Sequence, residues 1–556
     1  MSQYPSPVSL SPDGKRILVK TRHEKDFEIS ILDRVSGLVV ASDRSPDTQL
    51  SLTWHPDSEA IAFQEAREGN RQYQLCVLSS RTKKRHRLNA PITRSAAPPI
   101  RWHPEGLKLA YFVTTESRSG RIVSVNTEDN GEPATILDEA ALNGDFAWSP
   151  NGDELAAVSA LESSRVLLVR IQPKELKAID LPSGTIVRDL AWAPSGKTML
   201  MTVRFPESEF FELIEVEIKT SQLIKRLSSR GDISTPLWLE PGPSFLVHLE
   251  GFGNRVPLLG SFTQELRPVL DLTNGVHQCR ILADGESYNV LTKMPTSAST
   301  LLEVRLDTKK VSQIYPLPSE SRAENVTPEM VFFNSVDGTS IPGILWRSTQ
   351  TKEKLKGVLI DVHGGPRLQA TTEQNPAKQW LLSNGIHIMS VNYRGSAGYG
   401  RAFEEADAET NQIDDIVAAC RYATDTLPGA GRHIVLLGSS HGSKLVLGAS
   451  KRWSGPLTGI VITSFSSAPD DAISQWSDHR FYIYGFHGQH DSITAPSLAR
   501  AGLERYLGRE CFSPTNGNWE VLPGEGHQFH RTISWAKVYT SVLLLLDLNR
   551  TGLDSM

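Results

Sequence analysis

Ser440 lies in a pentapeptide that could carry nucleophilic chemistry. The sequence around it reads Gly438-Ser439-Ser440-His441-Gly442, which has the pattern G-x-S-x-G, and an apolar segment precedes it. Small residues in this pattern allow a sharp turn between a strand and a helix, and the turn exposes the serine hydroxyl. The N-terminus of the following helix directs backbone N–H groups toward developing negative charge. The pattern therefore predicts a nucleophilic serine, with an ordinary Gly/Ser turn as the alternative.

Asp491 and His527 are the expected partners of Ser440. A serine hydroxyl becomes a strong nucleophile when a histidine takes its proton, and that histidine needs a carboxylate that fixes its tautomer and stabilises its charged form. With such an elbow these groups occur in the chain order Ser, Asp, His. Asp491 ends the segment H-G-Q-H-D after one apolar stretch, and His527 ends P-G-E-G-H after the next. We therefore predict that Asp491 orients the histidine and that His527 is the general base.

Other acidic residues and histidines compete for these two roles. Three aspartates lie in a linker or ahead of a predicted strand: Asp470, Asp471 and Asp478. Three further histidines are alternatives to the base. His530 is the nearest to His527 in the sequence, whereas we expect His490 and His441 to be local polar residues. A place just after the end of a strand favours Asp491 and His527 over these alternatives.

A glycine-rich turn could supply the remaining group that acyl transfer needs. The tetrahedral intermediate carries an oxyanion, which well-placed N–H donors stabilise. An apolar segment leads into His363-Gly364-Gly365-Pro366, so this turn should lie at the same sheet edge as the elbow. We therefore predict an oxyanion hole made by the backbone N–H groups of Gly365 and His441.

Strands and helices alternate after about residue 325. Apolar segments separated by segments of helical periodicity are typical of a mostly parallel, doubly wound sheet with helices on both faces. The predicted strands are Gly357 to His363, His387 to Asn392, Ile434 to Gly438, Ile460 to Thr463, Phe481 to His487 and Trp519 to Leu522. The predicted helices are Asn375 to Ser383, Ile413 to Thr426, His441 to Trp453, Ala495 to Tyr506 and Ser534 to Leu548. We therefore predict an α/β-hydrolase catalytic domain over residues 325–556.

A turn motif recurs through the first three-fifths of the chain. Copies such as W-H-P-D-S-E-A-I-A-F end one strand, turn through proline and a small or acidic residue, and resume with alternating apolar positions. The copies begin, at steps of 44 to 48 residues, at Leu10, Trp54, Trp102, Trp148, Trp192, Trp238 and Leu282. A period of ~40 to 50 residues with internal turn signals is typical of a β-propeller. The seven copies predict a seven-bladed, all-β propeller over residues 1–324, with an array of β-sandwiches as the alternative.

The charge of the chain does not favour nucleic acid as a partner, and the length of its apolar runs does not favour a membrane. Charged residues make up 22% of the chain and the net charge is −5, so the global basicity that usually accompanies nucleic-acid binding is missing. A basic cluster from Arg81 to Arg87 lies between an apolar segment and Leu88, and we expect it to decorate a solvated hairpin turn. The longest late apolar run, Val542 to Leu546, is far shorter than the ~20 residues of a membrane span.

The cysteines and the N-terminus favour a cytoplasmic location. The four cysteines lie far apart and form no C-x-x-C pair: Cys76, Cys279, Cys420 and Cys511. This spacing fits neither a disulfide framework nor a zinc site, so we predict buried thiols in a reducing compartment. The first 15 residues lack the apolar core of a signal peptide.

Taken together, these motifs resemble the prolyl oligopeptidase family of serine peptidases, and within it the acylaminoacyl-peptidase and dipeptidyl-peptidase-like branch. Besides the repeats and the elbow, the resemblance is carried by Ser335-Val-Asp337-Gly338, Asp361-Val-His363-Gly-Gly-Pro, Val391-Asn-Tyr393-Arg-Gly-Ser-Ala-Gly-Tyr399-Gly, His487-Gly-Gln-His-Asp491 and Glu525-Gly-His527. It implies hydrolysis of short peptides, or of peptides with an acylated or blocked amino-terminal residue, through an acyl-enzyme. It also implies that the enzyme uses no metal or organic cofactor.

Two features of the hydrolase region depart from the family pattern. The elbow usually reads like G-G-S-Y-G-G, whereas this chain has His441 and Ser443 at the positions of tyrosine and the last glycine. Only 51 residues separate Ser440 from Asp491 (491 − 440), and the insert that helps to wall the substrate pocket in relatives is correspondingly short. The chain also begins almost directly with the first predicted blade. These departures affect the expected specificity more than the expected triad.

Two other functions stay open at this point. The same triad and oxyanion donors serve an esterase, thioesterase or acyl transferase that acts on a small ester or a peptidyl intermediate. A non-catalytic protein that binds partners through its propeller is a third hypothesis, which the complete Ser440, Asp491 and His527 set disfavours. The preferred side chain, the choice between endo- and exo-cleavage, and assembly into a homo-oligomer are left open by the sequence.

Overall fold

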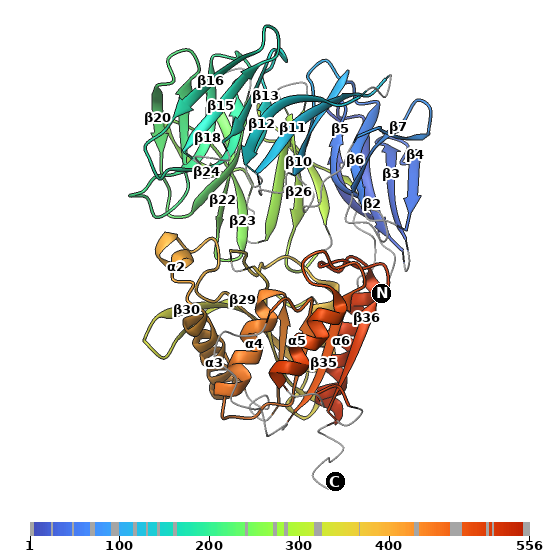
Figure 1. Ribbon diagram of the computed structural model, residues 1–556, viewed down its shortest axis with the longest axis vertical. Helices are drawn as coiled ribbons and strands as arrows, with labels where there is room; N and C mark the ends of the chain where they lie inside the picture. Colours follow the sequence, from blue (N-terminus) through green and yellow to red (C-terminus); the bar gives the residue numbers. More distant parts are fainter. Residues whose placement is uncertain are drawn as a thin grey trace. The chain divides into compact units, whose positions relative to one another are not determined.

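The structure is a computed structural model, and Figure 1 follows the chain from its N- to its C-terminal end. It describes residues 5–23, 26–46, 49–66, 73–90, 99–114, 119–128, 132–141, 145–159, 164–239, 243–270, 275–282, 287–297, 299–315, 325–365, 367–427, 433–467, 481–507, 511–513 and 516–548. These residues form two compact units. Within the described chain, the first unit contains residues 5–293 and 299–315, and the second contains residues 294–297 and 325–548.

Five four-stranded antiparallel sheets begin the first unit. The first two are β1 (Pro5–Leu10), β2 (Arg16–Arg22), β3 (Phe27–Asp33) and β4 (Val39–Ser45), then β5 (Gln49–Trp54), β6 (Ala60–Ala66), β7 (Tyr73–Ser79) and β8 (Arg85–Arg87). The third and fourth are β9 (Ile100–Trp102), β10 (Lys108–Thr114), β11 (Ser119–Asn126) and β12 (Ala134–Ala141), then β13 (Phe146–Trp148), β14 (Glu154–Val158), β15 (Arg165–Arg170) and β16 (Glu175–Asp180). The fifth is β17 (Ile186–Trp192), β18 (Thr198–Arg204), β19 (Glu212–Glu217) and β20 (Leu223–Leu227).

The sixth sheet of this unit has eight strands and divides into two groups of four. The groups are β21 (Asp232–Trp238), β22 (Ser244–Gly251), β23 (Asn254–Ser261) and β24 (Gln264–Pro268), then β25 (Val276–Ile281), β26 (Ser287–Lys293), β27 (Thr300–Arg305) and β28 (Val311–Tyr315). Pairing within each group is antiparallel. Among the described residues, the groups are joined through one parallel pair, Arg255 with Val276. Each group therefore has the make-up of one of the smaller sheets.

The strand groups of the first unit pack in chain order and close on themselves. Each group shares a cluster of buried apolar side chains with the next group along the chain. Leu10 of β1 lies in one cluster with Leu291 of β26, which joins the first group to the last. Arg34, which follows β3, adds an ion pair with Glu303 of β27 at 2.7 Å. The groups therefore form a closed ring, as a propeller requires.

The repeated turn residues hold neighbouring sheets of this ring together. Trp54 ends β5 and donates its indole N–H to Ser9 Oγ on the preceding sheet, at 3.1 Å. His55, in the turn, packs edge-on against Trp102 of the following sheet, and its Nε2 lies 3.0 Å from the carbonyl oxygen of Gly106. Gly106 has φ +81°, and a Cβ on it would lie 2.3 Å from the His55 ring. The W-H-P repeat is therefore a set of contacts between sheets as well as a turn signal.

The second unit is built on one eight-stranded sheet in the order β29-β30-β32-β31-β33-β34-β35-β36. Its strands are β29 (Glu329–Asn334), β30 (Ser340–Trp346), β31 (Gly357–Val362), β32 (Ile386–Val391), β33 (Ile434–Ser439), β34 (Gly459–Thr463), β35 (Tyr482–Gly488) and β36 (Gly517–Leu522). Its helices are η1 (Lys352–Lys354), α1 (Pro376–Ser383), α2 (Arg401–Glu405), α3 (Glu409–Thr426), α4 (His441–Arg452), α5 (Pro496–Leu507) and α6 (Thr532–Leu548). β29, β30 and β32 pair antiparallel, and the other neighbours pair parallel.

The six strands and five helices predicted for this unit are all present, and four short elements were missed. The missed elements are η1, α2 and the hairpin of β29 and β30. In β29 the inward residues Val331 and Phe333 are buried, but Phe332 between them is also apolar and 53% exposed. A run of four apolar residues, from Met330 to Phe333, hides the alternation that would indicate a strand. Helix α3 begins at Glu409, four residues before its predicted start at Ile413.

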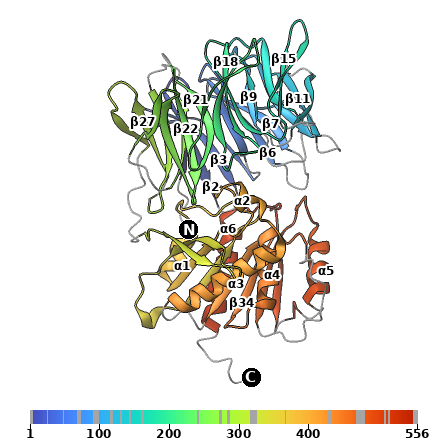
Figure 2. The ribbon, with the colours of Figure 1, turned by 90° about the vertical axis from the view of Figure 1, so that its left-hand side faces the viewer.

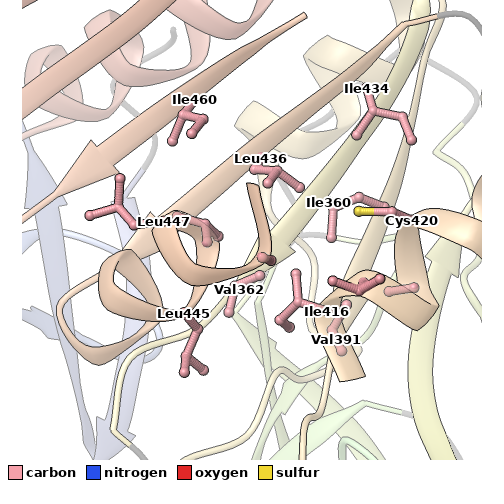
Figure 3. Packing of buried hydrophobic residues seen from close by; sticks show 14 of the residues in the cluster. Ile360, Val362, Val391, Ile416, Cys420, Ile434, Leu436, Leu445, Leu447 and Ile460 are labelled. Atoms are coloured by element: carbon pink, nitrogen blue, oxygen red, sulfur yellow. The ribbon is translucent and has the colours of Figure 1, made fainter. Parts of the chain in front are cut away.

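Helices cover both faces of this sheet. Along β33, Ile434 and Leu436 pack into a core with α3, α4 and α5, whereas Val435 and Leu437 pack into a second core with α1 and α6. Figure 3 shows part of the first core, in which the strand residues Val362 and Leu436 and the α4 residue Leu445 are labelled. Figure 2 shows α3 and α4 on the same side of the sheet. Among the described helices, none is both long and apolar enough to cross a membrane.

The four cysteines and the basic cluster lie as the sequence predicted. Each cysteine is buried with a free thiol: Cys76, Cys279, Cys420 and Cys511. Burial raises the pKa of each of these thiols to about 12, so they are unreactive at neutral pH. The cluster from Arg81 to Arg87 forms the exposed turn between β7 and β8 and the strand β8 itself. Arg85 and Arg87 pair with the buried Glu65.

Candidate active site

Ser440 sits in a tight turn between β33 and the first residue of α4. Its backbone has φ 51° and ψ −116°, a conformation that is strained for any residue with a side chain. The Ser440 N–H donates to the carbonyl oxygen of Thr463 on β34 at 2.9 Å, which holds the turn against the sheet. A Cβ on Gly442 would lie 2.4 Å from the carbonyl oxygen of Val362 on β31. Gly442, the second glycine of the G-x-S-x-G pattern, is therefore needed because a larger residue would prevent this close approach of two backbone segments.

The structure brings the three predicted triad residues into one hydrogen-bonded chain. His527 Nε2 lies 2.8 Å from Ser440 Oγ, and His527 Nδ1 lies 2.7 Å from Asp491 Oδ2. Asp491 follows β35 and His527 follows β36, so both side chains extend from the carboxyl ends of strands to the elbow. These are the distances at which a histidine can take the proton of a serine hydroxyl while a carboxylate orients it.

Asp491 is a buried carboxylate that its surroundings keep ionised. Burial by itself raises the pKa of this carboxyl, but hydrogen bonds from His487, His527 and the backbone N–H of Thr494 outweigh that effect and hold the pKa well below its usual range. Oδ1 accepts the backbone N–H groups of Ile493 at 2.8 Å and Thr494 at 3.0 Å. The residue is therefore equipped to stay negative while the neighbouring imidazole gains a proton.

The loop that carries His527 is fixed from two sides. Ser464, which follows β34 with φ 52°, donates its hydroxyl to the carbonyl oxygen of His527 at 2.5 Å. The buried carboxylate of Glu525 accepts the backbone N–H groups of His530 at 2.8 Å and Arg531 at 2.9 Å, at the start of α6. These bonds fix the backbone on both sides of the imidazole, which is the kind of support that the predicted general base would need.

The glycine-rich turn after β31 lies directly beside the elbow. A Cβ on Gly364 would lie 3.3 Å from Ser440 Cβ, and Gly365 has φ +126°, a backbone conformation that favours glycine. The Tyr393 hydroxyl donates to the carbonyl oxygen of His363 at 3.0 Å and so holds this turn. His441 is the first residue of α4, where a backbone N–H has no acceptor within the helix. Gly364 thus lies close to the Ser440 side chain, and His441 follows Ser440 directly in the chain.

Two histidines near the nucleophile are held neutral. Burial lowers the pKa of His363 to about 4, and the ring stacks on Tyr393 with its centroid at 4.5 Å. Burial, and then Lys444, lower the pKa of His441, whose Nε2 lies 2.8 Å from Gln412 Oε1. Their side chains therefore serve to fix the two turns around Ser440, and neither contacts the Ser440 hydroxyl as His527 does.

A buried polar network on one side of the elbow includes residues whose roles the sequence did not reveal. Arg394 pairs with the fully buried Asp415 at 2.6 Å and also with Asp337. Ser335 donates its hydroxyl to Asp415 at 2.7 Å, and the amide of Gln412 donates to the carbonyl oxygen of Arg394 at 2.8 Å. The family-like segments around residues 335–338 and 391–400 were the available signal, but only the fold shows that they meet α3.

The alternative site residues have other surroundings. His530 lies beside His527 in the chain, but its backbone binds Glu525 while His527 meets Ser440. The backbone N–H of His490 also donates to the Glu525 loop, at 2.8 Å. The three competing aspartates lie outside the described residues: Asp470, Asp471 and Asp478.

Comparisons with known proteins agree with the motifs. Residues 373–462 match the model of the prolyl oligopeptidase family. Over 93 residues the chain is 30% identical to dipeptidyl aminopeptidase BIII of Pseudoxanthomonas mexicana, an alignment that covers 16% of this chain and 14% of that protein. The chain therefore aligns with about a seventh of the length of this curated relative. The predicted resemblance to the prolyl oligopeptidase family is confirmed.

Solved structures match over almost the whole chain. One comes from an analysis of two prolyl endopeptidases, with a TM-score of 0.79, 14% identity, and coverage of 98% of this chain and 90% of that chain. Another is a puromycin-hydrolysing peptidase of Mycobacterium tuberculosis, with a TM-score of 0.77, 14% identity, and coverage of 98% and 94%. Identities this low show the fold alone. The predicted combination of a β-propeller with an α/β-hydrolase unit is confirmed.

Proposed function

Because this chain is a relative of the prolyl oligopeptidase family, we propose that it is a serine peptidase. Its proposed substrates are short peptides, or peptides with an acylated or blocked amino-terminal residue. The observation that carries the proposal is the hydrogen-bonded chain from Ser440 through His527 to Asp491, at 2.8 and 2.7 Å. The similar proteins described above are named as peptidases, which supports amide hydrolysis over ester hydrolysis.

In the first half of the proposed reaction, Ser440 Oγ attacks the carbonyl carbon of the scissile bond. His527 Nε2 takes the hydroxyl proton, and Asp491 stabilises the imidazolium that forms. When the tetrahedral intermediate collapses, the C–N bond breaks and the leaving amine takes the proton from His527. The acyl group stays on Ser440 as an ester.

In the second half, water replaces the amine. His527 takes a proton from the water molecule, whose oxygen attacks the ester carbonyl carbon. Collapse of this second intermediate breaks the bond to Ser440 Oγ, which regains its proton from His527. The products are the carboxylic acid and the free enzyme, and no external oxidant or cofactor is required.

The proposed oxyanion donors are the backbone N–H groups of Gly365 and His441. Among the described residues, neither group has a hydrogen-bond acceptor, so both are free to meet the negative oxygen of the intermediate. A Cβ on Gly364 would lie 3.3 Å from Ser440 Cβ, so this turn approaches the serine closely, which supports a hole on this side of the hydroxyl. Removal of a single oxyanion donor typically costs ~10²- to 10³-fold in kcat.

The proposal extends to the organisation and location of the chain. We propose seven blades over residues 1–324 and a catalytic domain over residues 325–556. The seven four-stranded groups support this blade count, with the eight-stranded sheet divided at its single parallel pair. We also propose a cytoplasmic location, which the four buried free thiols support.

A matched pair of substrates tests the proposed activity. Peptide anilides and esters with the same acyl part, in free, acetylated and proline-containing forms, are offered to the pure protein. An enzyme built for amides should retain substantial rates on the anilides, whereas one active on the ester alone would favour the esterase reading. A fluorophosphonate should label the wild type and leave Ser440→Ala unlabelled. An unlabelled wild type would overturn the proposed function and support a binding protein.

A further inference from the structure

His487 is a fully buried histidine beside the triad that the proton transfers above do not use. It lies near the end of β35, and its side chain has no exposed surface. The ring stacks on Trp519 of the neighbouring strand β36, with centroids 5.6 Å apart. A buried polar ring in such a place is costly unless its nitrogen atoms make hydrogen bonds.

The contacts of His487 fix its tautomer. Nε2 lies 2.8 Å from the carbonyl oxygen of Thr494 and 3.1 Å from Asp491 Oδ2. Both partners are acceptors, so Nε2 must carry the hydrogen. Nδ1 is buried and has no hydrogen-bond partner among the described residues. The Nε2–H of His487 is therefore the donor that lies within reach of both Thr494 and Asp491.

Asp491 Oδ2 consequently receives two histidine donors. His527 Nδ1 approaches it at 2.7 Å and His487 Nε2 at 3.1 Å, while Oδ1 accepts the backbone N–H groups of Ile493 and Thr494. Each donor offsets part of the negative charge of the carboxylate. Two donors on one oxygen also fix the rotation of the carboxylate, because turning it would break both bonds.

We propose that His487 is a positioning residue for the triad. Its Nε2–H holds Asp491 Oδ2 in line with His527 and moderates the attraction of this carboxylate for the imidazolium. The inference rests on the proposed function, since it concerns the same Ser440, His527 and Asp491 site. No atom of His487 contacts the Ser440 hydroxyl or takes part in a bond that forms or breaks.

Loss of this donor has a predictable sign. Without the His487 N–H, the negative charge on Oδ2 is less compensated and stabilises the protonated form of His527 more strongly. His527 then stays protonated, and unable to accept the serine proton, up to a higher pH. The acid limb of activity should therefore move to higher pH, and the plateau rate should fall because the carboxylate is less well fixed.

Two substitutions distinguish the effect of the His487 N–H donor from the effect of its aromatic ring. His487→Phe keeps a flat ring against Trp519 but removes the N–H. His487→Gln removes the ring, but its amide nitrogen occupies the place of Nε2 and has two hydrogens, one for Asp491 and one for Thr494. His490→Phe is the matched control, because this histidine lies in the same loop and, among the described residues, its side chain forms neither a hydrogen bond nor an ion pair with Asp491.

The experiment measures the rate of fluorophosphonate labelling of Ser440 against pH, together with kcat and KM on the preferred substrate. For His487→Phe we expect the acid limb to move up by roughly 0.5 to 1 pH unit, the shift that loss of one hydrogen bond implies. We expect the plateau rate to fall by about tenfold with KM within about twofold. His487→Gln should restore both the acid limb and most of the rate, and His490→Phe should behave as wild type.

The failures of the two proposals are distinguishable. A labelled, active wild type whose acid limb does not move up in folded His487→Phe would overturn the inference alone. A His487→Gln protein as impaired as the phenylalanine variant would also overturn it, because the ring alone would then matter. If His487→Phe does not fold, His487→Gln decides the matter through the same two readouts. A wild type that the probe leaves unmodified would overturn the proposed function and this inference with it.

Discussion

In the first unit, one kind of contact between neighbouring sheets, that of a histidine ring with a glycine backbone, occurs more than once. In the second unit, each contact of the candidate active site occurs once among the described residues. His55 meets the backbone of Gly106 at 3.0 Å, and His103 meets that of Gly152 at 3.1 Å in the next sheet along the ring. The 2.8 Å contact of His527 with Ser440 has no second copy among the described residues. Because the contacts between sheets are repeated, each of them contributes only a part of the stability of the ring.

This difference separates the effects that a single substitution should have on stability and on activity. A change in one repeat of the ring removes one of several similar contacts, so we expect a modest loss of stability and little change in chemistry. A change at the elbow removes a group that nothing replaces. The predictions below place substitutions of both kinds side by side.

Ser440→Ala should have the largest effect on activity and almost none on folding. In the proposed mechanism the hydroxyl of Ser440 is the nucleophile, and this side chain lies at a turn rather than in a core. We expect kcat to fall by ~10⁴- to 10⁶-fold, with an unchanged urea unfolding transition. Wild-type turnover by a correctly folded Ser440→Ala protein would eliminate the proposed mechanism.

His527→Ala and Asp491→Asn should differ in severity. Alanine removes the base, whereas asparagine leaves the base but presents it in the wrong tautomer. We expect a loss in kcat of about 10⁴-fold for Asp491→Asn and a larger loss for His527→Ala. Equivalent substitutions of Asp470, Asp471 and Asp478 are the controls. A severe loss in one of these variants, with an active Asp491→Asn, would show that the acid was wrongly assigned.

The hydrogen-bonded set of Ser440, His527 and Asp491 could be predicted from the sequence because each of these residues belongs to a local pattern. The elbow needs only five consecutive residues, and Asp491 and His527 each follow a recognisable strand. Gln412 and Ser464 carry no such pattern. Each reaches the site across a tertiary contact, Gln412 with the His441 ring and Ser464 with the carbonyl oxygen of His527. Polar residues of this kind become informative only when the fold shows which backbone groups they bind.

Much of the fold could be predicted for a similar reason. Six copies of the repeat end a strand as expected: Leu10, Trp54, Trp102, Trp148, Trp192 and Trp238. At the seventh copy, Leu282 directly follows β25, and the turn after it lies outside the described residues. The joining of the last two strand groups through Arg255 and Val276 could not be predicted. One parallel pair leaves no periodic signal in the sequence.

Gly442→Ala, at the elbow, should lower both stability and activity, whereas Gly106→Ala, in the ring, should lower stability alone. The added Cβ at Gly442 would lie 2.4 Å from a backbone oxygen of β31, which cannot move without distorting the sheet. At Gly106 the nearest atoms belong to the His55 ring, which can rotate away, and the remaining cost is that of a positive φ.

For Gly442→Ala we therefore expect a loss of at least ~3 kcal/mol in the free energy of unfolding, together with severely reduced turnover. For Gly106→Ala we expect about 1 to 2 kcal/mol and normal turnover. Urea unfolding and anilide hydrolysis measure the two quantities. Equal losses of activity in both variants would show that the ring and the elbow are not separable in this way.

The pH dependence of stability should reveal the ionised state of Asp491. Its folded pKa is held below the unfolded value of ~3.9, so the unfolded chain binds more protons in acid. The stabilisation is therefore complete above about pH 5 and is lost as the pH falls toward the folded pKa. The difference in free energy of unfolding between wild type and Asp491→Asn should shrink as the pH is lowered from about 6 to about 3.5. A difference that grows over this range would contradict the assignment.

Trp54→Phe should have the smallest effect, and Trp238→Phe provides its matched control. Both tryptophans end the first strand of their group, at corresponding positions of the repeat. The indole N–H of Trp54 donates to Ser9 Oγ at 3.1 Å, whereas the buried indole nitrogen of Trp238 has no partner among the described residues. Phenylalanine removes the N–H in both cases and also some apolar contact. The difference between the two variants therefore isolates one hydrogen bond.

We expect Trp54→Phe to lose about 1 kcal/mol more in the free energy of unfolding than Trp238→Phe, because a satisfied donor is removed in one and an unsatisfied donor in the other. Urea unfolding at neutral pH measures both, and turnover should stay within about twofold of wild type because neither change reaches the triad. A larger loss for Trp238→Phe would mean that the indole N–H groups do not join neighbouring sheets. A large loss of turnover in either variant would mean that a single contact in the ring governs the active site, and that the contrast between repeated and single contacts does not describe this protein.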